Sequence, residues 1–247
     1  MKISKAIRSL KCILKYGIQP VYRRQRMRIQ SHYIPHLGAV SQTSQFGQDD
    51  ALMQYVDISK KGFFVDIGAH DGVTGSNSVI FEKKLGWDGV CFEPNPILFQ
   101  QCQENRACSC ENACISSQAG KCKFILLPDS ISMLGGIEEF MTNEHLKRIE
   151  VSLKPEDRPF VKKILINSVV LTEYLLMKGR THIDLLLIDV EGAEMDILKS
   201  IDFLKVCIDV ICVENNYHGD EISCYLHNYG YELKMRIACD EIYKKIQ

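Results

Sequence analysis

Five acidic side chains stand at or beside the ends of short apolar runs in this sequence. They are Asp66, Glu93, Asp189, Glu191 and Glu214. Short β-rich apolar runs are typical of central parallel strands, whose carboxyl ends meet at one edge of a sheet. A single acid at a strand end can also be a helix cap or a solvated loop residue. Five such acids predict a carboxylate-lined rim around a ligand cleft.

A glycine-rich turn follows the first of these runs. Glu93 comes 25 residues after Gly68, a spacing at which a carboxylate behind the second strand can accept both hydroxyls of a ribose. The turn is not the phosphate-binding pattern G-x-G-x-x-G, because three residues separate Gly68 from Gly72, and Asp66 and Asp71 accompany it. Two carboxylates would repel a pyrophosphate. The turn therefore favours a cationic nucleoside without phosphate, such as S-adenosylmethionine, over NAD.

Strand-type runs alternate with segments of helical spacing along most of the chain. This order predicts an α/β fold, with a Rossmann-like doubly wound, mostly parallel sheet of about seven strands and flanking helices. Strands are predicted at 63–67, 89–92, 113–116, 121–127, 164–171, 182–190, 206–213, 231–237 and 241–244, the last two as an antiparallel pair. Helices are predicted within 41–56 and at 73–85, 96–107, 141–149, 172–178, 193–201 and 221–228.

Two segments outside this alternation are expected to border the ligand. Residues 41–56 combine a polar stretch with a short helix just before the first strand, so they could cover the cleft. Residues 128–159 show no strand pattern. Because excursions of this length inside a compact domain are usually lids or mobile segments, we expect this one and the region after Glu214 to form the acceptor pocket.

The composition is typical of a globular cytoplasmic protein. Of 247 residues, 46% are hydrophobic and 25% charged, and no run approaches the ~18 apolar residues of a membrane span. The N-terminus also lacks the apolar core of a signal peptide. Ordinary reduced thiols are favoured over a zinc site because no CxxC pair occurs among five clustered cysteines. These are Cys102, Cys108, Cys110, Cys114 and Cys122.

Charge is divided unevenly along the chain. Residues 1–48 hold nine Lys or Arg and no acid, so the remainder carries 21 basic and 31 acidic groups, a net charge of −10. We predict a basic helical extension at 1–40 and one catalytic domain at 41–247. A basic amphipathic helix can bind the inner face of an anionic membrane, here through residues 1–30, or dock on its own domain or a second subunit. Nucleic-acid binding is not expected because the extension lacks interleaved aromatic residues.

Five stretches resemble the FkbM family of S-adenosylmethionine-dependent class I methyltransferases. They are SQFGQDD (44–50), FFVDIGAHDGVTGSNS (63–78), GWDGVCFEPNP (86–96), INSVVLTEYL (166–175) and IDLLLIDVEGAEMDILKSIDF (183–203). The resemblance spans roughly 44–244 and leaves the first 40 residues outside. It implies an O-methyltransferase acting on a hydroxyl of a sugar, glycan or related small metabolite, in pathways such as polysaccharide biosynthesis.

The resemblance also implies which residues bind the cofactor. Glu93 would hold the ribose hydroxyls, Pro94 would shape the adenosine side, and Cys114 and Ile115 would flank the adenine. The full set of implied cofactor-binding residues is Asp66, Gly68, Ala69, Asp71, Gly72, Glu93, Pro94 and Asp189.

Methyl transfer to an alcohol requires alignment and a base. Holding oxygen, methyl carbon and sulfur in line can be worth ~7–11 kcal/mol, and a general base contributes typically ~10²–10⁴-fold. The candidate bases are Asp189, Glu191, Glu214 and His218, with Asp189 or Glu191 preferred. The less favoured alternative is a divalent cation on Asp189 and Glu191 that acidifies the hydroxyl; because the sequence shows no third ligand, no metal is expected.

Two other functions remain open at the level of sequence. One is a non-catalytic protein that keeps the cofactor fold and is tethered by its basic extension. The other is a nicotinamide-dependent oxidoreductase, which shares the sheet but not the chemistry of the turn.

Overall fold

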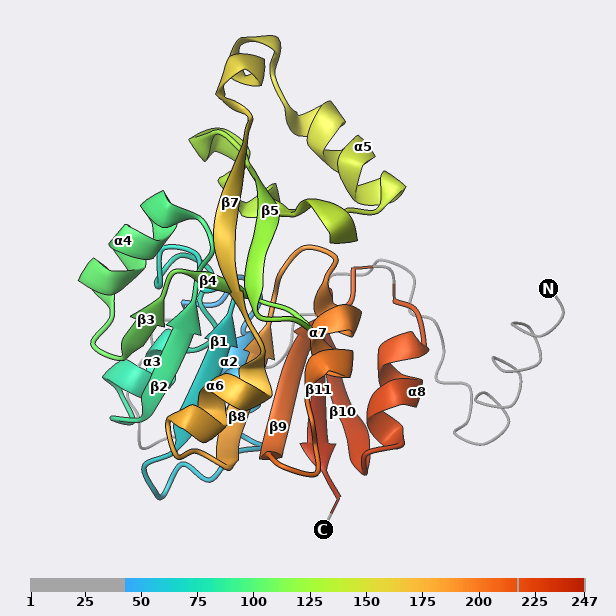
Figure 1. Cartoon of the computed structure of the whole chain (residues 1–247). Coiled ribbons are helices and arrows are strands. Elements are labelled where there is room, and N and C mark those ends of the chain that lie inside the picture. Colours follow the sequence, from blue (N-terminus) through green and yellow to red (C-terminus); the bar gives the residue numbers. More distant parts are fainter. Residues whose placement is uncertain (1–42, 217, 247) are drawn as a thin grey trace, which may run out of the picture.

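The computed structural model describes residues 43–216 and 218–246 (Figure 1). The basic extension predicted at 1–40 lies outside these residues. The described part forms a seven-stranded sheet of order β10-β11-β9-β8-β1-β2-β3. The strands are β1 (Phe63–Ile67), β2 (Asp88–Phe92), β3 (Ser109–Glu111), β8 (His182–Ile188), β9 (Cys207–Glu214), β10 (Tyr231–Ile237) and β11 (Asp240–Lys245). The predicted doubly wound α/β sheet is confirmed.

Strand direction within this sheet explains where a ligand can bind. Neighbours from β3 through β9 pair in parallel, and β11 pairs antiparallel with both β9 and β10. The strand order reverses between β1 and β8, since the chain moves outward from β1 to β2 and β3 and then returns. In such sheets the crevice beyond the carboxyl ends at the reversal is the usual ligand site.

Helices cover both faces of the sheet. The central strand β1 is buried along its whole length, and its apolar side chains pack against helices on each face. Phe63, Val65 and Ile67 pack on one face with α6, α7 and α8, and Phe64 packs on the other with α2 and α3. The helices are α2 (Gln48–Leu52), α3 (Val79–Lys83), α4 (Pro96–Asn105), α5 (Asn143–Ser152), α6 (Leu171–Met177), α7 (Glu194–Ser200) and α8 (Glu221–His227). No helix among the described residues is long and apolar enough to cross a membrane.

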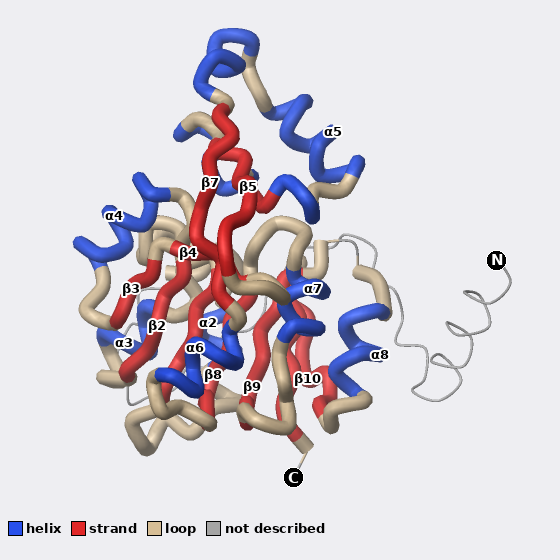
Figure 2. Tube along the Cα trace, in the orientation of Figure 1, coloured by secondary structure: helices blue, strands red, loops and turns tan. Residues whose placement is uncertain are grey.

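A second sheet rises from the carboxyl edge of the first, together with α5 (Figures 1 and 2). Its order is β4-β7-β5-β6. Its strands are β4 (Ala113–Ile115), β5 (Gly120–Leu126), β6 (Gly136–Ile137) and β7 (Lys162–Val169). Short 3₁₀ helices complete it at η1 (Asp129–Leu134), η2 (Glu138–Phe140) and η3 (Pro155–Phe160). The segment 128–159, predicted to be a lid, belongs to this upper layer.

Two predicted elements differ from the structure. The strand predicted at 113–116 is β4 of the upper sheet, and the outer strand of the main sheet is β3, whose three residues are too few and too polar to form an apolar run. The helix predicted at 73–85 begins only at Val79. Gly72 and Gly75 have positive φ, and the Asp71 side chain accepts the Thr74 N–H, so residues 71–75 form turns.

The clustered cysteines also divide between the two sheets. Cys114 and Cys122 contact each other in the upper sheet. Cys102 lies 3.6 Å from Cys110 in sulfur–sulfur distance, beside Cys91 of β2. The sequence did not indicate Cys91 as a member of the group, because it lies outside the cysteine-rich stretch.

Candidate functional site

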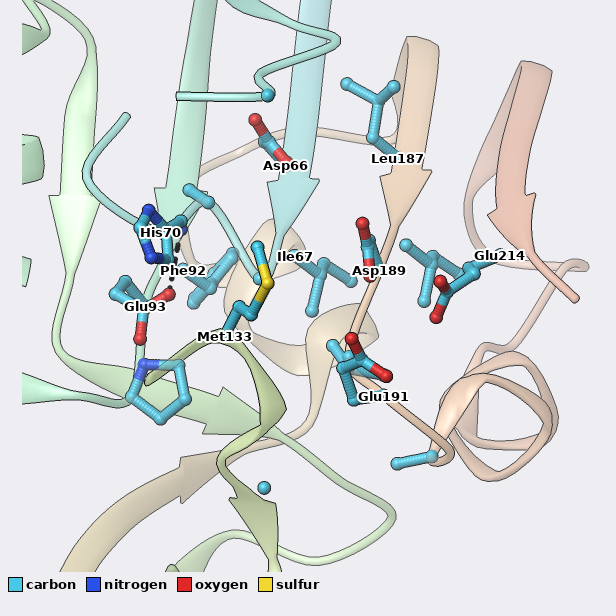
Figure 3. A pocket seen from close by; sticks show the side chains of 18 of the residues that line it. Asp66, Ile67, His70, Phe92, Glu93, Met133, Leu187, Asp189, Glu191 and Glu214 are labelled. Atoms are coloured by element: carbon cyan, nitrogen blue, oxygen red, sulfur yellow. Dashed lines mark hydrogen bonds between the residues drawn. The ribbon is translucent and has the colours of Figure 1, made fainter. Parts of the chain in front are cut away.

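A cavity of about 320 Å³ opens above the carboxyl ends of β1, β2, β8 and β9 (Figure 3). This volume lies within the range of small-molecule sites. The main sheet supplies its floor, and parts of η1, β6 and α5 supply its roof, including Met133 and Arg148. The cavity therefore lies where the strand order predicts a ligand.

The turn that follows β1, at Gly68 and Ala69, is held in place by close packing of backbone atoms. Gly68 has φ +89°, and a Cβ there would lie 1.8 Å from the carbonyl oxygen of Asp189. The N–H groups of Gly68 and Ala69 both donate to the carbonyl of Phe92, at 3.0 and 3.1 Å. Gly68 is thus required where the ends of β1 and β8 meet, and both Gly68 and Ala69 line the cavity.

Glu93 is held by two backbone N–H groups. His70 donates to one carboxylate oxygen at 2.9 Å, and Asn95 donates to the other at 2.8 Å. His70 adopts a left-handed conformation, φ +54°, at this position. Burial raises the pKa of Glu93 to about 8, against the opposing effect of these two hydrogen bonds. The carboxylate is consequently fixed in orientation at the cavity wall, with lone pairs left for ligand hydroxyls.

An apolar slot adjoins Glu93. Pro94, Leu98, Ala113, Cys114 and Ile115 line it. Three of these residues, Pro94, Cys114 and Ile115, are those expected around an adenine. The structure places them in the same cavity as Glu93.

Two residues expected to bind cofactor, Asp71 and Gly72, are not among those that line the cavity. Asp71 accepts the N–H groups of Val73 and Thr74 at 2.9 and 2.7 Å, so its side chain is used within the turn. The carbonyl of Gly72 accepts a hydrogen bond from Arg106 at 3.1 Å. Both residues therefore support the turn in this structure, and their contact with the cofactor stays a prediction.

Asp66 reaches the cavity wall, but its carboxylate faces the same supporting network. Ser78 donates to it, and the Arg106 guanidinium lies 4.0 Å away. Burial raises the pKa of Asp66, although Arg106 and Ser78 oppose the effect. In Figure 3 its carboxylate lies apart from the acids at the ends of β8 and β9.

A second acidic group lies across the cavity from Glu93 (Figure 3). Carboxylate oxygens of Asp189, Glu191 and Glu214 all lie within 4.8 Å of one another. Desolvation within the cavity raises the pKa of Asp189 although the residue is open to the cavity, and Glu214 and Asp240 add to the increase. Burial likewise raises the pKa of Glu214 to about 8, with Glu191 as the next contributor. The three acids could share a proton or hold a cation.

Glu191 connects this group to the roof. Its φ of +57° is left-handed, and its carboxylate accepts a 2.5 Å hydrogen bond from Arg148 of α5. The His145 ring nitrogen lies 3.8 Å from the same oxygen. Burial raises the pKa of Glu191, and Arg148 opposes that shift. The sequence did not indicate Arg148, because segment 128–159 carries no pattern that aims a side chain at β8.

The segment before β1 closes another side of the cavity, as predicted. Gln45, Phe46 and Gln48 line it, and Gln48 donates to Asp240 at 2.6 Å. Ser44 forms a β-bridge with Gly75, which joins this segment to the glycine-rich turn. His218, a candidate base, is not among the residues that line the cavity.

A second group of possible metal ligands lies outside the cavity. Among the residues that the structure describes, sulfur atoms of Cys91, Cys102 and Cys110 lie within 4.8 Å of one another. Cys91 and Cys102 are buried, and the group lies in the core between β2, α4 and β3.

Comparison with known proteins places this arrangement in context. A family model described as the methyltransferase FkbM domain matches residues 66–233. A search of curated proteins gave no match.

Solved structures similar to this chain include three bacterial proteins. Methyltransferase FkbM from Methylobacillus flagellatus KT has 14% identity and a TM-score of 0.43, over 74% of this chain and 43% of that one. A TehB-like SAM-dependent methyltransferase from Corynebacterium glutamicum has 10% identity and a TM-score of 0.43, over 82% and 89%. Precorrin-6y C5,15-methyltransferase from Geobacter metallireducens has 12% identity and a TM-score of 0.39, over 79% and 84%. The present chain thus spans less than half the length of the Methylobacillus protein.

Proposed function

We propose that this chain, which belongs to the FkbM methyltransferase family, transfers a methyl group from S-adenosylmethionine to a hydroxyl group of a sugar, glycan or related metabolite. Such a reaction would serve pathways such as polysaccharide biosynthesis. The observation that carries the proposal is one cavity with an anchored carboxylate beside an apolar slot and a group of acids opposite.

Each part of S-adenosylmethionine can be assigned to one of these features of the cavity. Glu93 would accept the two ribose hydroxyls, because its oxygens are oriented by His70 and Asn95. The slot beside Pro94 and Ile115 would take the adenine. The methionine end would lie against the turn at Gly68 and Ala69, with the methyl group directed toward Asp189 and Glu191.

The reaction itself needs two contributions from the protein. The acceptor oxygen attacks the methyl carbon while the carbon–sulfur bond breaks, and the sulfonium becomes a neutral thioether. Holding the three atoms in line is the larger contribution, of ~7–11 kcal/mol. The acceptor proton passes to a carboxylate, for which we favour Asp189, because Glu191 is paired with Arg148 and Asp189 is open to the cavity.

The roof is the natural place for the acceptor. Ser132, Met133, Gly136 and Arg148 line the cavity from this side. Their mixture of polar and apolar groups suits a hydroxylated molecule lying over the methyl group.

Calorimetry and label transfer test this function together. Isothermal titration of the full chain should give micromolar or tighter binding of S-adenosylmethionine, and tight NAD binding without it would overturn the proposal. Incubation with cofactor labelled in the methyl group, and with fractionated glycans and metabolites, should label a hydroxylated fraction. Binding without transfer to any fraction would instead indicate a non-catalytic protein.

A further inference from the structure

The carboxyl groups of Asp189, Glu191 and Glu214, here called the carboxylate triad, lie within 4.8 Å of one another in ligand-atom distance and have few cationic partners among the described residues. Within residues 43–216 and 218–246, the ion pairs of the triad involve Glu191 alone, with Arg148 and His145. Asp240 lines the same cavity and adds a further carboxyl group beside the triad.

Glu214 supplies an independent observation that points to a missing ligand. The residue is 6% exposed, and its Oε2 atom has no hydrogen-bond partner among the residues that the structure describes. Figure 3 shows its carboxylate beside Asp189 at the cavity. A buried carboxylate oxygen without a partner costs free energy, so such atoms in folded proteins normally meet a donor or a cation.

We propose that the carboxylate triad binds a hard divalent cation, Mg²⁺ or Mn²⁺, and that this ion holds the acceptor oxygen. Carboxylate oxygens are the ligands these ions prefer. Two ligands of an octahedral ion with bonds of about 2.1 Å lie roughly 3.0 Å apart when adjacent and 4.2 Å apart when opposite. The triad, whose oxygens lie within 4.8 Å of one another, needs only small side-chain movements to reach that geometry.

The ion would deepen the proposed function, on which this inference rests. Three carboxylates leave coordination positions open toward the cavity, where an acceptor hydroxyl can bind. A bound cation lowers the pKa of such a hydroxyl, and its proton passes to water; with the ion bound, Asp189 acts as a ligand and no longer as the base. Glu214 provides the third ligand that could not be recognised in the sequence.

The experiment titrates Mn²⁺ into the full chain after treatment with EDTA and follows the electron paramagnetic resonance signal of free Mn²⁺. We expect one ion per chain, displaced by excess Mg²⁺, and at least a tenfold loss of affinity in Glu214→Gln. Glu173→Gln, a change at an exposed acid of α6, is the matched control and should bind like the original chain. Absence of binding, or equal binding by Glu214→Gln and the original chain, would overturn the proposal.

Two further measurements keep the result interpretable. Should thermal melting show that Glu214→Gln is unfolded, Asp189→Asn takes its place, because Asp189 is open to the cavity, and the same loss is expected. Titration of S-adenosylmethionine in EDTA then separates the two proposals. Cofactor binding without Mn²⁺ binding contradicts the ion site alone, whereas Mn²⁺ binding without cofactor binding supports the ion site and contradicts the proposed function.

Discussion

At the scale of single residues, the two ends of the cavity differ in how their acids are held. Glu93 is oriented by backbone N–H groups that the turn after β1 and the start of α4 supply. Asp189 and Glu214 instead lie among like charges. The fixed orientation of Glu93 suits a constant contact with a ligand. The crowded carboxyl groups of Asp189 and Glu214 suit the exchange of protons or cations.

The raised pKa of Glu93 makes nucleoside binding depend on pH. Below its pKa of about 8 the carboxyl is protonated, so binding ribose hydroxyls to the carboxylate must also release a proton. Affinity should therefore fall as pH decreases from 8 to 6, by at most about tenfold per unit. Calorimetry with adenosine, which does not titrate in this range, measures the effect. Glu93→Gln should bind more weakly at pH 8 and show no slope, and a flat profile for the original chain would contradict the prediction.

Replacement of Asp189 separates catalysis from cofactor binding. Asp189→Asn removes the proposed base while keeping the shape, so turnover should fall by about 10²–10⁴-fold and cofactor affinity should change little. Single-turnover transfer of labelled methyl, together with calorimetry, measures the two quantities. Asp196→Asn, at an exposed position of α7, serves as the control. Equal losses of turnover and affinity would assign Asp189 to cofactor binding instead.

At the scale of elements, the site is built by segments added around a conventional sheet. The upper sheet and α5 form the roof, and the segment before β1 forms a side wall. Each is joined to the floor by a defined contact, Arg148 to Glu191 in one case and Ser44 to Gly75 in the other. The shape of the cavity therefore depends both on the strand ends and on how the upper sheet, α5 and the segment before β1 pack against them.

Asp49 holds the segment before β1 in place through hydrogen bonds. It is fully buried and accepts hydrogen bonds from the Thr43 and Asp50 N–H groups and from the Ser44 hydroxyl. Asp49→Ala leaves these donors unpaired, so the free energy of unfolding in urea should fall by about 1–3 kcal/mol.

Cofactor affinity of the same variant should also fall, because Gln45, Phe46 and Gln48 line the cavity beside it. Glu104→Ala, at an exposed position of α4, should leave both quantities unchanged. Unchanged affinity in a destabilised Asp49→Ala would show that the wall does not contact the cofactor.

At the scale of the whole molecule, charge and structure divide the chain in the same place. The sheet, the roof and the cavity are contained in the described residues from 43 onward. The residues before Asp49 carry only basic charges, and those after it are predominantly acidic. We therefore expect cofactor binding not to depend on the basic extension.

A chain that begins at Gln42 tests this separation. It should melt cooperatively and bind S-adenosylmethionine as the full chain does, because it retains all the described residues that line the cavity. Flotation with vesicles that contain anionic lipid should retain the full chain and not the shortened one, since a basic amphipathic helix gains both charge attraction and apolar burial there. Equal flotation of the two would contradict membrane contact through residues 1–30.

The sequence by itself determined the central strands, the acids at their ends and the position of Glu93. These follow from local patterns, because a run such as residues 63–67 reports burial of its own strand. The same reasoning could not assign Asp71, whose spacing fits a ligand contact but whose side chain closes a turn.

Only the tertiary structure brought together groups that are far apart in the chain. Glu214 joins Asp189 because β8 and β9 end side by side, and Arg148 reaches Glu191 because α5 folds over that edge. The placement of 113–115 in the upper sheet was decided in the same way. Sequence periodicity specifies which face of an element is buried, whereas the packing of elements decides which side chains meet.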